Sequence, residues 1–300
     1  MRDGIDAVAF DCYGTLVDFG DDAFRDAYAL ICAEQGLTVD GQAFYDKWLE
    51  VWRRLARGPS TGSGRGGAIE GLGADAVLNR PAPLSETEPV LSHAEGVIPP
   101  HPQHHTPAAG RSRSLDGPLP PFRSYREEWP EHFAICFEEL GVRGDAKRAH
   151  ERLVGLMARA EAFPESRGVV DAVARHLPVA VLSNADDDFL HAVLARNGLS
   201  LPLVVSSEFA RAYKPHVAIF RRLSEQLALP PERILYVGDS RLADVAGAKN
   251  AGMRAAWVQR PSGQTINRTF DGGQEPLPFA ADFEIDNLGL LLDILDLREA

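Results

Sequence analysis

The chain of 300 residues has little cysteine, no excess of positive charge and no long hydrophobic run. Its cysteines, Cys12, Cys32 and Cys136, are scattered and form no metal-binding pair, and their odd number fits a reducing compartment. No apolar stretch reaches membrane-spanning length, and the apolar run near the start is too short for a signal peptide. These absences predict a cytoplasmic protein that contacts no membrane.

The charge balance excludes a further class of partner. The formal net charge is -12 and the sequence pI is near 5.2, which disfavours nucleic acid as a partner. A small-molecule substrate is the remaining expectation, and an anionic one would need a local cationic group. The length allows two structural units, and the composition leaves a monomer and a homodimer equally open.

One short stretch near the start organises the chain. A run of apolar residues, 7–10, passes directly into Asp11, and Gly14 follows three positions later. An apolar run that ends abruptly in this way is typical of a buried strand that breaks into a loop. Ligands of open α/β sheets bind beyond the carboxyl ends of the strands, so Asp11 is a candidate for chemistry.

Helical periodicity with an unusual interruption follows this strand. Apolar spacing predicts four helices, which make residues 19–160 a helical cap, over residues 21–36, 41–57, 125–140 and 145–157. Between the second and third helices, residues 58–122 are rich in glycine, proline and serine and sparse in apolar residues. This composition predicts a disordered insert, because it offers too little apolar surface to offset the ordering entropy.

The rest of the chain alternates strands and helices. Expected strands are residues 6–10, 179–182, 203–205, 234–237, 255–258 and 282–285, and expected helices are 168–176, 187–196, 216–227, 243–251 and 288–297. This alternation predicts an α/β fold with a doubly wound, mostly parallel sheet. Residues 1–18 and 161–300 then form the core domain, with the cap inserted after the first strand.

Polar residues follow four of these strands. Asp11 is joined by the hydroxyl of Ser183 and the amide of Asn184, then by Lys214, and finally by Asp239 with Asp244. A carboxylate can attack phosphorus or an electrophilic carbon and form an ester that water hydrolyses. A lysine can neutralise developing charge, and paired acids suit Mg²⁺. We expect these groups to meet at one edge of the sheet.

These motifs resemble those of the haloacid dehalogenase superfamily of hydrolases. The matching segments, in order, are Asp11-Cys12-Tyr13-Gly14-Thr15-Leu16, Leu182-Ser183-Asn184, Lys214-Pro215 and Gly238-Asp239-Ser240 with Asp244. The resemblance implies a Rossmann-like core with a cap and catalysis through an aspartyl ester. It also implies a catalytic set of Asp11, Tyr13, Thr15, Ser183, Asn184 and Lys214, and Mg²⁺ ligands at Asp11, Tyr13, Asp239 and Asp244.

Within that superfamily the chain combines features of two branches. Phosphatases usually carry a second aspartate where this chain has Tyr13, and tyrosine there resembles 2-haloacid dehalogenases. The segment Gly238-Asp239-Ser240 instead resembles phosphatases. The arginine that dehalogenases use for the halide aligns near 44–46, where Arg25, Arg53 or Arg54 could substitute.

Three functions therefore stay open. We expect a Mg²⁺-dependent phosphate monoester hydrolase, because Asp11, Asp239 and Asp244 would otherwise crowd negative charge around Lys214. The alternatives are a metal-independent 2-haloacid dehalogenase and a binding or regulatory protein with little turnover.

Overall fold

The computed structural model describes residues 4–56, 115–261 and 279–297. In these ranges one sheet is formed by β1 (Ala7–Phe10), β2 (Val179–Ser183), β3 (Leu203–Ser206), β4 (Ile234–Gly238), β5 (Arg254–Val258) and β6 (Phe283–Ile285). The strand order is β3-β2-β1-β4-β5-β6, and each neighbouring pair is parallel. The expected α/β fold with a doubly wound parallel sheet is confirmed.

The strand order reverses at the centre of the sheet and creates the crevice in which such folds bind ligands. β1 lies between β2 and β4, and Phe10 at its end is in register with Val181 and Val237. The residues that follow these strands therefore emerge side by side at one edge of the sheet.

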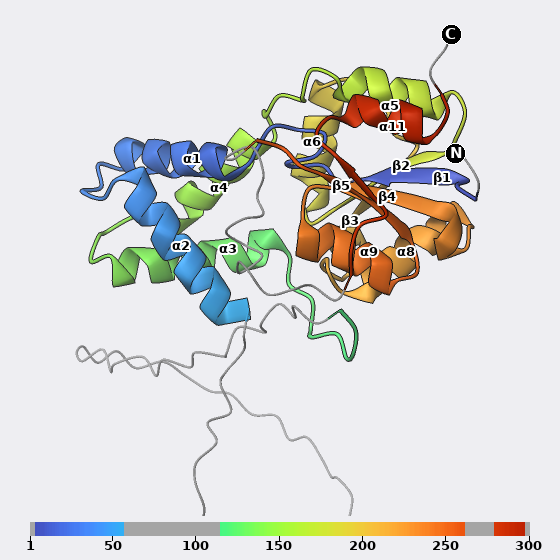
Figure 1. Ribbon diagram of the computed structural model, residues 1–300. Coiled ribbons are helices and arrows are strands. Elements are labelled where there is room, and N and C mark those ends of the chain that lie inside the picture. Colours follow the sequence, from blue (N-terminus) through green and yellow to red (C-terminus); the bar gives the residue numbers. More distant parts are fainter. Residues whose placement is uncertain (1–3, 57–114, 262–278, 298–300) are drawn as a thin grey trace, which may run out of the picture. The chain divides into compact units, whose positions relative to one another are not determined.

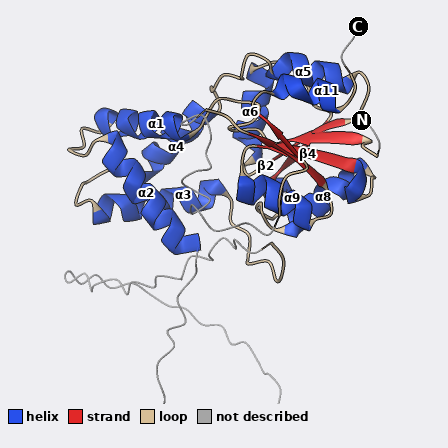
Figure 2. Ribbon diagram, in the orientation of Figure 1, coloured by secondary structure: helices blue, strands red, loops and turns tan. Residues whose placement is uncertain are grey.

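Side chains of the strands alternate between two apolar layers. Val8 and Phe10 join one cluster with helices α5 (Ser166–Ala174), α6 (Asp187–Arg196) and α11 (Leu291–Ile294). Ala9 joins the other with α8 (Val217–Leu227) and α9 (Gly247–Asn250). Figures 1 and 2 show these helices on opposite faces of the sheet. β1 is buried on both faces, which is why its sequence is uniformly apolar.

The four expected cap helices are present as α1 (Asp21–Glu34), α2 (Gly41–Ala56), α3 (Tyr125–Glu139) and α4 (Ala146–Met157). Their shared core is aromatic: Tyr28 from α1 contacts Phe44 and Trp48 from α2 and Phe133 from α3. The cap aromatic residues are therefore packing residues of this bundle. No helix in the described part of the chain is long and apolar enough to cross a membrane.

The short elements are α7 (Ser207–Ala210), η1 (Pro231–Arg233), η2 (Arg241–Ala246) and η3 (Leu288–Leu290). η2 replaces the first half of the helix expected over residues 243–251, and it is π-helical. The helix α8 begins at Val217, one residue after the start expected at 216. His216 caps it instead, since its Nδ1 accepts a hydrogen bond from the amide of Ala218.

The end of the expected insert is held by the core. The carbonyl of Leu115 accepts hydrogen bonds from the amide of Val217 (2.7 Å) and from Nδ2 of Asn250 (3.0 Å). The carbonyl of Gly117 is 3.1 Å from Nε2 of His216. The last part of the expected insert, residues 115–122, is therefore hydrogen-bonded to the core at Leu115 and Gly117. Residues 57–114, which hold the rest of the insert, lie outside the described ranges.

Candidate active site

Asp11 lies directly after β1, and donors from two other segments fix its carboxylate. The Nζ of Lys214 is 2.6 Å from its Oδ1. The hydroxyl of Ser183, at the end of β2, donates to the same oxygen over 3.2 Å. Asp11 is only 6% exposed, so these bonds are made away from bulk water. Because both donors meet at Oδ1, the carboxylate is held in one orientation and Oδ2 faces the hydroxyl of Thr15 at 3.5 Å.

The loop after Asp11 contacts Asp239, which follows β4. The hydroxyl of Thr15 is 3.3 Å from Asp239 Oδ1, so one buried hydroxyl lies between the two carboxylates. Gly14 has a φ of +86°, and a Cβ there would lie 2.3 Å from Asp239 Oδ2. Only glycine allows both this backbone conformation and this approach. The indole of Trp257 donates to the Asp239 carbonyl over 2.8 Å and holds its backbone.

Asp244 reaches the site from the widened turn η2. The amide of Val245 donates to the carbonyl of Ser240, five residues earlier, over 2.9 Å. Asp244 Oδ2 accepts from the amide of Ser240 at 2.8 Å, and Oδ1 is 2.6 Å from Lys214 Nζ. A Cβ at Gly238 would lie 2.3 Å from Asp244 Cγ, so glycine is needed there as well. Widened turns of this kind occur frequently at functional sites.

Burial and charge oppose each other in this cluster. Burial works to lower the pKa of Lys214, but the carboxylates of Asp11 and Asp244 raise it well above its usual value. The ammonium is therefore charged. Burial raises the pKa of Asp244 to about 6, although Lys214 acts to lower it. A single ammonium thus offsets only part of the cost of burying these acids.

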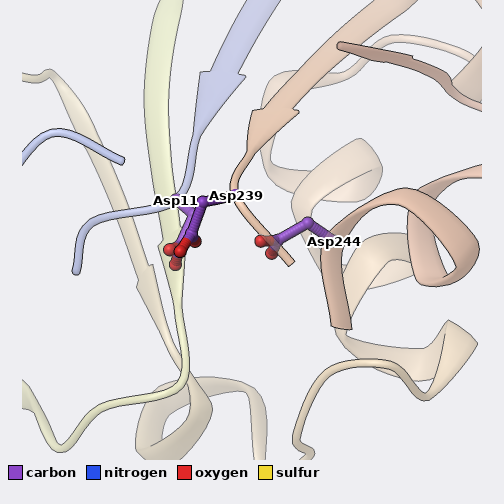
Figure 3. A group of neighbouring side chains, drawn as sticks. All are labelled: Asp11, Asp239 and Asp244. Carbon is purple, nitrogen blue, oxygen red and sulfur yellow. The ribbon is translucent and has the colours of Figure 1, made fainter. Parts of the chain in front are cut away.

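The cluster has the donor set of a hard cation. Oxygen atoms of Asp11, Asp239 and Asp244 lie within 4.8 Å of one another, and all these residues are buried. Figure 3 shows Asp11 and Asp239 together, with Asp244 directed toward them from its helical turn. Carboxylate oxygens in such a group are the ligands that Mg²⁺ prefers. Three carboxylates and one ammonium leave a net negative charge that a divalent ion would balance. The residues present therefore fit a bound Mg²⁺.

Tyr13 does not join this cluster through its side chain. Its hydroxyl donates to the carbonyl of Phe189 over 3.5 Å, and its ring packs against Phe19 and Phe189. Burial raises the pKa of the phenol well above its usual value. The expectation that Tyr13 is both catalytic and a metal ligand therefore finds no support in its side chain, because aromatic packing turns the ring away.

Asn184 also acts differently from the sequence-based expectation. Its Nδ2 donates to the carbonyl of Lys214 over 3.1 Å, and its Oδ1 accepts from the amide of Lys214 over 2.8 Å. Both ends of the amide group are therefore engaged with the backbone of the lysine. Asn184 positions Lys214, whereas Ser183 beside it contacts Asp11 directly.

One residue of the cluster was missed by the sequence interpretation. The hydroxyl of Tyr236 is 3.0 Å from Lys214 Nζ and 3.2 Å from Asp244 Oδ1, and it donates to the carbonyl of Leu182 over 2.8 Å. Tyr236 lies within β4, where an aromatic residue indicates only a buried strand. A hydroxyl in an otherwise apolar strand was the available signal.

The cap arginines considered for halide binding have partners of their own. Arg25 pairs with Asp22 on the same helix, and its guanidinium lies over the ring of Tyr45. Arg54 is 2.6 Å from Glu139 of α3. These ion pairs occupy both arginines within the cap.

Comparison with known proteins agrees with this geometry. The model of one family, described as haloacid dehalogenase-like hydrolase, matches residues 5–252, which is most of the chain. The chain belongs to the haloacid dehalogenase-like hydrolases. The expected family is therefore confirmed.

The relatives of this chain fall into two kinds. Haloacetate dehalogenase H-2 of Moraxella sp. is 35% identical over 36% of this chain and 50% of its own length. A phosphoserine phosphatase of Thermus thermophilus is 34% identical over 43% of this chain and 53% of its own length. The matches span about half the length of these relatives. Sequence similarity thus leaves dehalogenase and phosphatase equally close.

Solved structures support the fold. An L-2-haloacid dehalogenase from Xanthobacter autotrophicus aligns over 97% of this chain and 98% of its own, with a TM-score of 0.63 and 21% identity. At this level of identity the similarity establishes the shared Rossmann-like core and cap.

Proposed function

We propose that this hydrolase cleaves small phosphate monoesters with Mg²⁺ as cofactor. The observation that carries the proposal is the group of three buried carboxylates, whose oxygens lie within 4.8 Å of one another and of which two, Asp11 and Asp244, pair with Lys214. The carboxylate of a 2-haloacid would add negative charge to this group. When a phosphate ester binds together with a divalent cation, the cation would instead offset the negative charge of the carboxylates and the phosphate.

In this reaction Asp11 is the nucleophile. A carboxylate oxygen attacks phosphorus, the bond to the ester oxygen breaks, and an aspartyl phosphate forms that water then hydrolyses. Lys214 and Ser183 hold the attacking group in orientation, and Lys214 offsets charge that develops on the phosphoryl oxygens. The proposed ligands of the cation are Asp11, Asp239 and Asp244, and Mg²⁺ would supply charge neutralisation on the phosphoryl group.

Protonation of the leaving group limits the range of substrates. The buried phenol of Tyr13 has a strongly raised pKa and bonds to a backbone carbonyl, so it is a poor acid at neutral pH. Esters whose leaving groups are stable as anions should therefore react faster than simple alkyl phosphates.

A 2-haloacid dehalogenase is the second candidate. A halide leaves without a proton, so the packed Tyr13 would be no disadvantage for that reaction. Relatives that include haloacetate dehalogenase H-2 also favour it. Asp11 would then attack carbon, and Lys214 would face the substrate carboxylate.

A parallel assay distinguishes these reactions. Purified protein is incubated with p-nitrophenyl phosphate, an alkyl phosphate and 2-chloropropionate, each with EDTA and with added Mg²⁺. We expect release of nitrophenolate that EDTA abolishes and Mg²⁺ restores. Asp11→Asn is the control and should retain less than about 1% of the wild-type rate, since an amide cannot form the ester. Chloride release that EDTA leaves unchanged would instead establish the dehalogenase.

A third outcome would overturn both reactions. Inactivity on all three substrates, with Mg²⁺ still raising the melting temperature, would indicate a binding or regulatory protein.

A further inference from the structure

The loop that carries Thr15 accepts hydrogen bonds from residues that lie about 150 to 245 positions later in the sequence. The carbonyl of Leu16 accepts hydrogen bonds from the hydroxyl of Ser166 (2.7 Å) and the amide of Phe163 (3.0 Å). The carbonyl of Thr15 accepts from Nη2 of Arg260 over 2.7 Å. Two successive carbonyls of this loop are therefore fixed by hydrogen bonds from residues 163, 166 and 260.

Arg260 is a buried cation that the hydrolytic site does not itself use. It follows β5, and its side chain is only 5% exposed. Its Nη1 is 2.6 Å from Oε1 of Glu165, and the guanidinium lies 3.6 Å from the centre of the Phe163 ring. Although burial works to raise it, hydrogen bonding and charge from Arg260 hold the pKa of Glu165 below its usual value. The pair is therefore ionised.

A buried ion pair is a weak source of stability, because desolvation offsets most of the attraction. Replacement by apolar residues is often neutral, so stability alone does not explain an arginine here. What Arg260 does provide is a fixed donor to one particular carbonyl. That carbonyl belongs to Thr15, whose hydroxyl lies 3.3 Å from Asp239 and 3.5 Å from Asp11.

We propose that Arg260, clamped by Glu165, is a positioning residue that sets the place of the Thr15 hydroxyl between Asp11 and Asp239. Arg260 acts through Thr15 and touches no reacting atom. The loop packs closely against the second carboxylate, since a Cβ at Gly14 would lie 2.3 Å from Asp239 Oδ2. Loss of the clamp therefore displaces the carboxylate geometry and lowers turnover.

Arginine is the residue type that this role needs. Its planar group donates in two directions at once, to Glu165 and to the Thr15 carbonyl, while its face lies on the Phe163 ring. A lysine has one nitrogen and no flat face, so it can keep the charge and lose the geometry.

The test compares Arg260→Met, Arg260→Lys and Glu165→Gln with wild type. Arg233→Met is the matched control, because Arg233 pairs with Asp6 on the same domain, away from the site. With p-nitrophenyl phosphate and Mg²⁺, we expect kcat to fall about 10²-fold in Arg260→Met with KM little changed. The fall should be smaller in Arg260→Lys and Glu165→Gln, and absent in the control.

A second measurement needs no substrate. Hydrogen exchange in the peptide that contains the amides of Gly14, Leu16 and Val17, each bonded within the loop, reports its order directly. We expect exchange there to be at least tenfold faster in Arg260→Met than in wild type, with α5 and β5 unchanged. Arg233→Met should leave this peptide as it is.

The kinetic measurement rests on the proposed phosphatase function, whereas hydrogen exchange does not. An inactive wild type would reject the phosphatase, and the loop peptide would still decide the role of Arg260. Unchanged exchange in the loop, or equal acceleration throughout the core domain, would overturn the positioning role. Wild-type kcat in Arg260→Met would overturn it as well. If Arg260→Met does not fold, Arg260→Lys and Glu165→Gln carry both measurements.

Discussion

Tyr13 illustrates how one residue can have the right position in sequence and another role in space. It lies two residues after Asp11, yet the residue is only 3% exposed and its ring contacts those of Phe19 and Phe189. A carboxylate installed there would be buried among aromatic rings, where its charged form is costly. A conservative substitution is therefore the better test of the phenol.

Tyr13→Phe should change turnover by less than about threefold. The hydroxyl makes one long hydrogen bond to a carbonyl, and loss of a single neutral bond costs only about 0.5–1.5 kcal/mol of stability. Turnover of p-nitrophenyl phosphate and 2-chloropropionate should be measured over pH 5–9 for both proteins. A rate lowered a hundredfold, or a lost limb of the pH profile, would show that the phenol transfers protons after all.

At the scale of elements, residues 115–122 act as a strap between the insert and the core. Leu115 and Gly117 accept three hydrogen bonds from His216, Val217 and Asn250. Phe122 stacks on Tyr213, whose hydroxyl donates to the carbonyl of Arg123. Apart from the bond from Asn250, these contacts are made with residues 213–217 around Lys214, so the strap supports the lysine loop.

Two deletions separate the strap from the rest of the insert. Replacing residues 59–107 by a ten-residue Gly-Ser linker should shift the melting temperature by less than about 2 °C, since sequence composition there offers little core. Extending the deletion to residue 121 removes three hydrogen bonds, and should lower it by about 5 °C or more. Thermal unfolding monitored by circular dichroism measures both. Equal melting temperatures would mean that the strap contributes nothing.

His150 on α4 makes cap stability depend on pH. His150 is 8% exposed, and its imidazole contacts the ring of Trp129. Burial lowers the pKa of this imidazole. Asp188 and Glu151 oppose this effect and Arg126 adds to it. The unfolded chain then binds a proton that the folded chain resists. This contribution to stability is present above the unfolded pKa, and it is lost as pH falls below about 6.5.

The difference between the melting temperatures at pH 7.5 and pH 5.5 should therefore be smaller for His150→Leu than for wild type. The exposed His191 of α6 provides the control, and His191→Leu should keep the wild-type difference. Differential scanning calorimetry at both pH values gives the comparison. If the melting temperature of His150→Leu falls between pH 7.5 and pH 5.5 by as much as that of wild type, His150 is excluded as a source of this pH dependence.

At the scale of the whole molecule, the acidic cluster links folding to a cation. Three carboxylates are buried close together, two of them paired with Lys214, and any ion that binds only the folded state stabilises it by mass action. Saturating Mg²⁺ should raise the melting temperature of wild type by roughly 5 °C. Asp239→Asn should remove most of that shift. Asp282→Asn, which alters an acid paired with Lys249 outside the cluster, should retain it.

A wild-type melting temperature that does not change when Mg²⁺ is added would contradict the proposed metal site. Asp239→Asn would then be expected to melt at a higher temperature than wild type with or without Mg²⁺, because one buried negative charge is gone.

Local pattern was enough to determine the sheet and the convergence of its motifs. β1 and β4 are buried on both faces, so their apolar runs appear in the sequence without ambiguity. Parallel strands end at one edge, and this alone brought Asp11, Ser183 and Asp239 together. The four cap helices were likewise visible from their apolar spacing.

Tertiary packing decided the orientation of the remaining groups. Tyr13 is turned by Phe189, 176 residues away, and the carbonyl of Thr15 is held by Arg260, 245 residues away. Asp244, on the π-helical turn, pairs with a lysine from another loop. No local propensity encodes these choices, because each depends on a partner that only the folded chain brings within reach. The sequence by itself determined that the polar groups at the strand ends meet, whereas packing across the fold determined which way each of them faces and which further group, Tyr236, joins them.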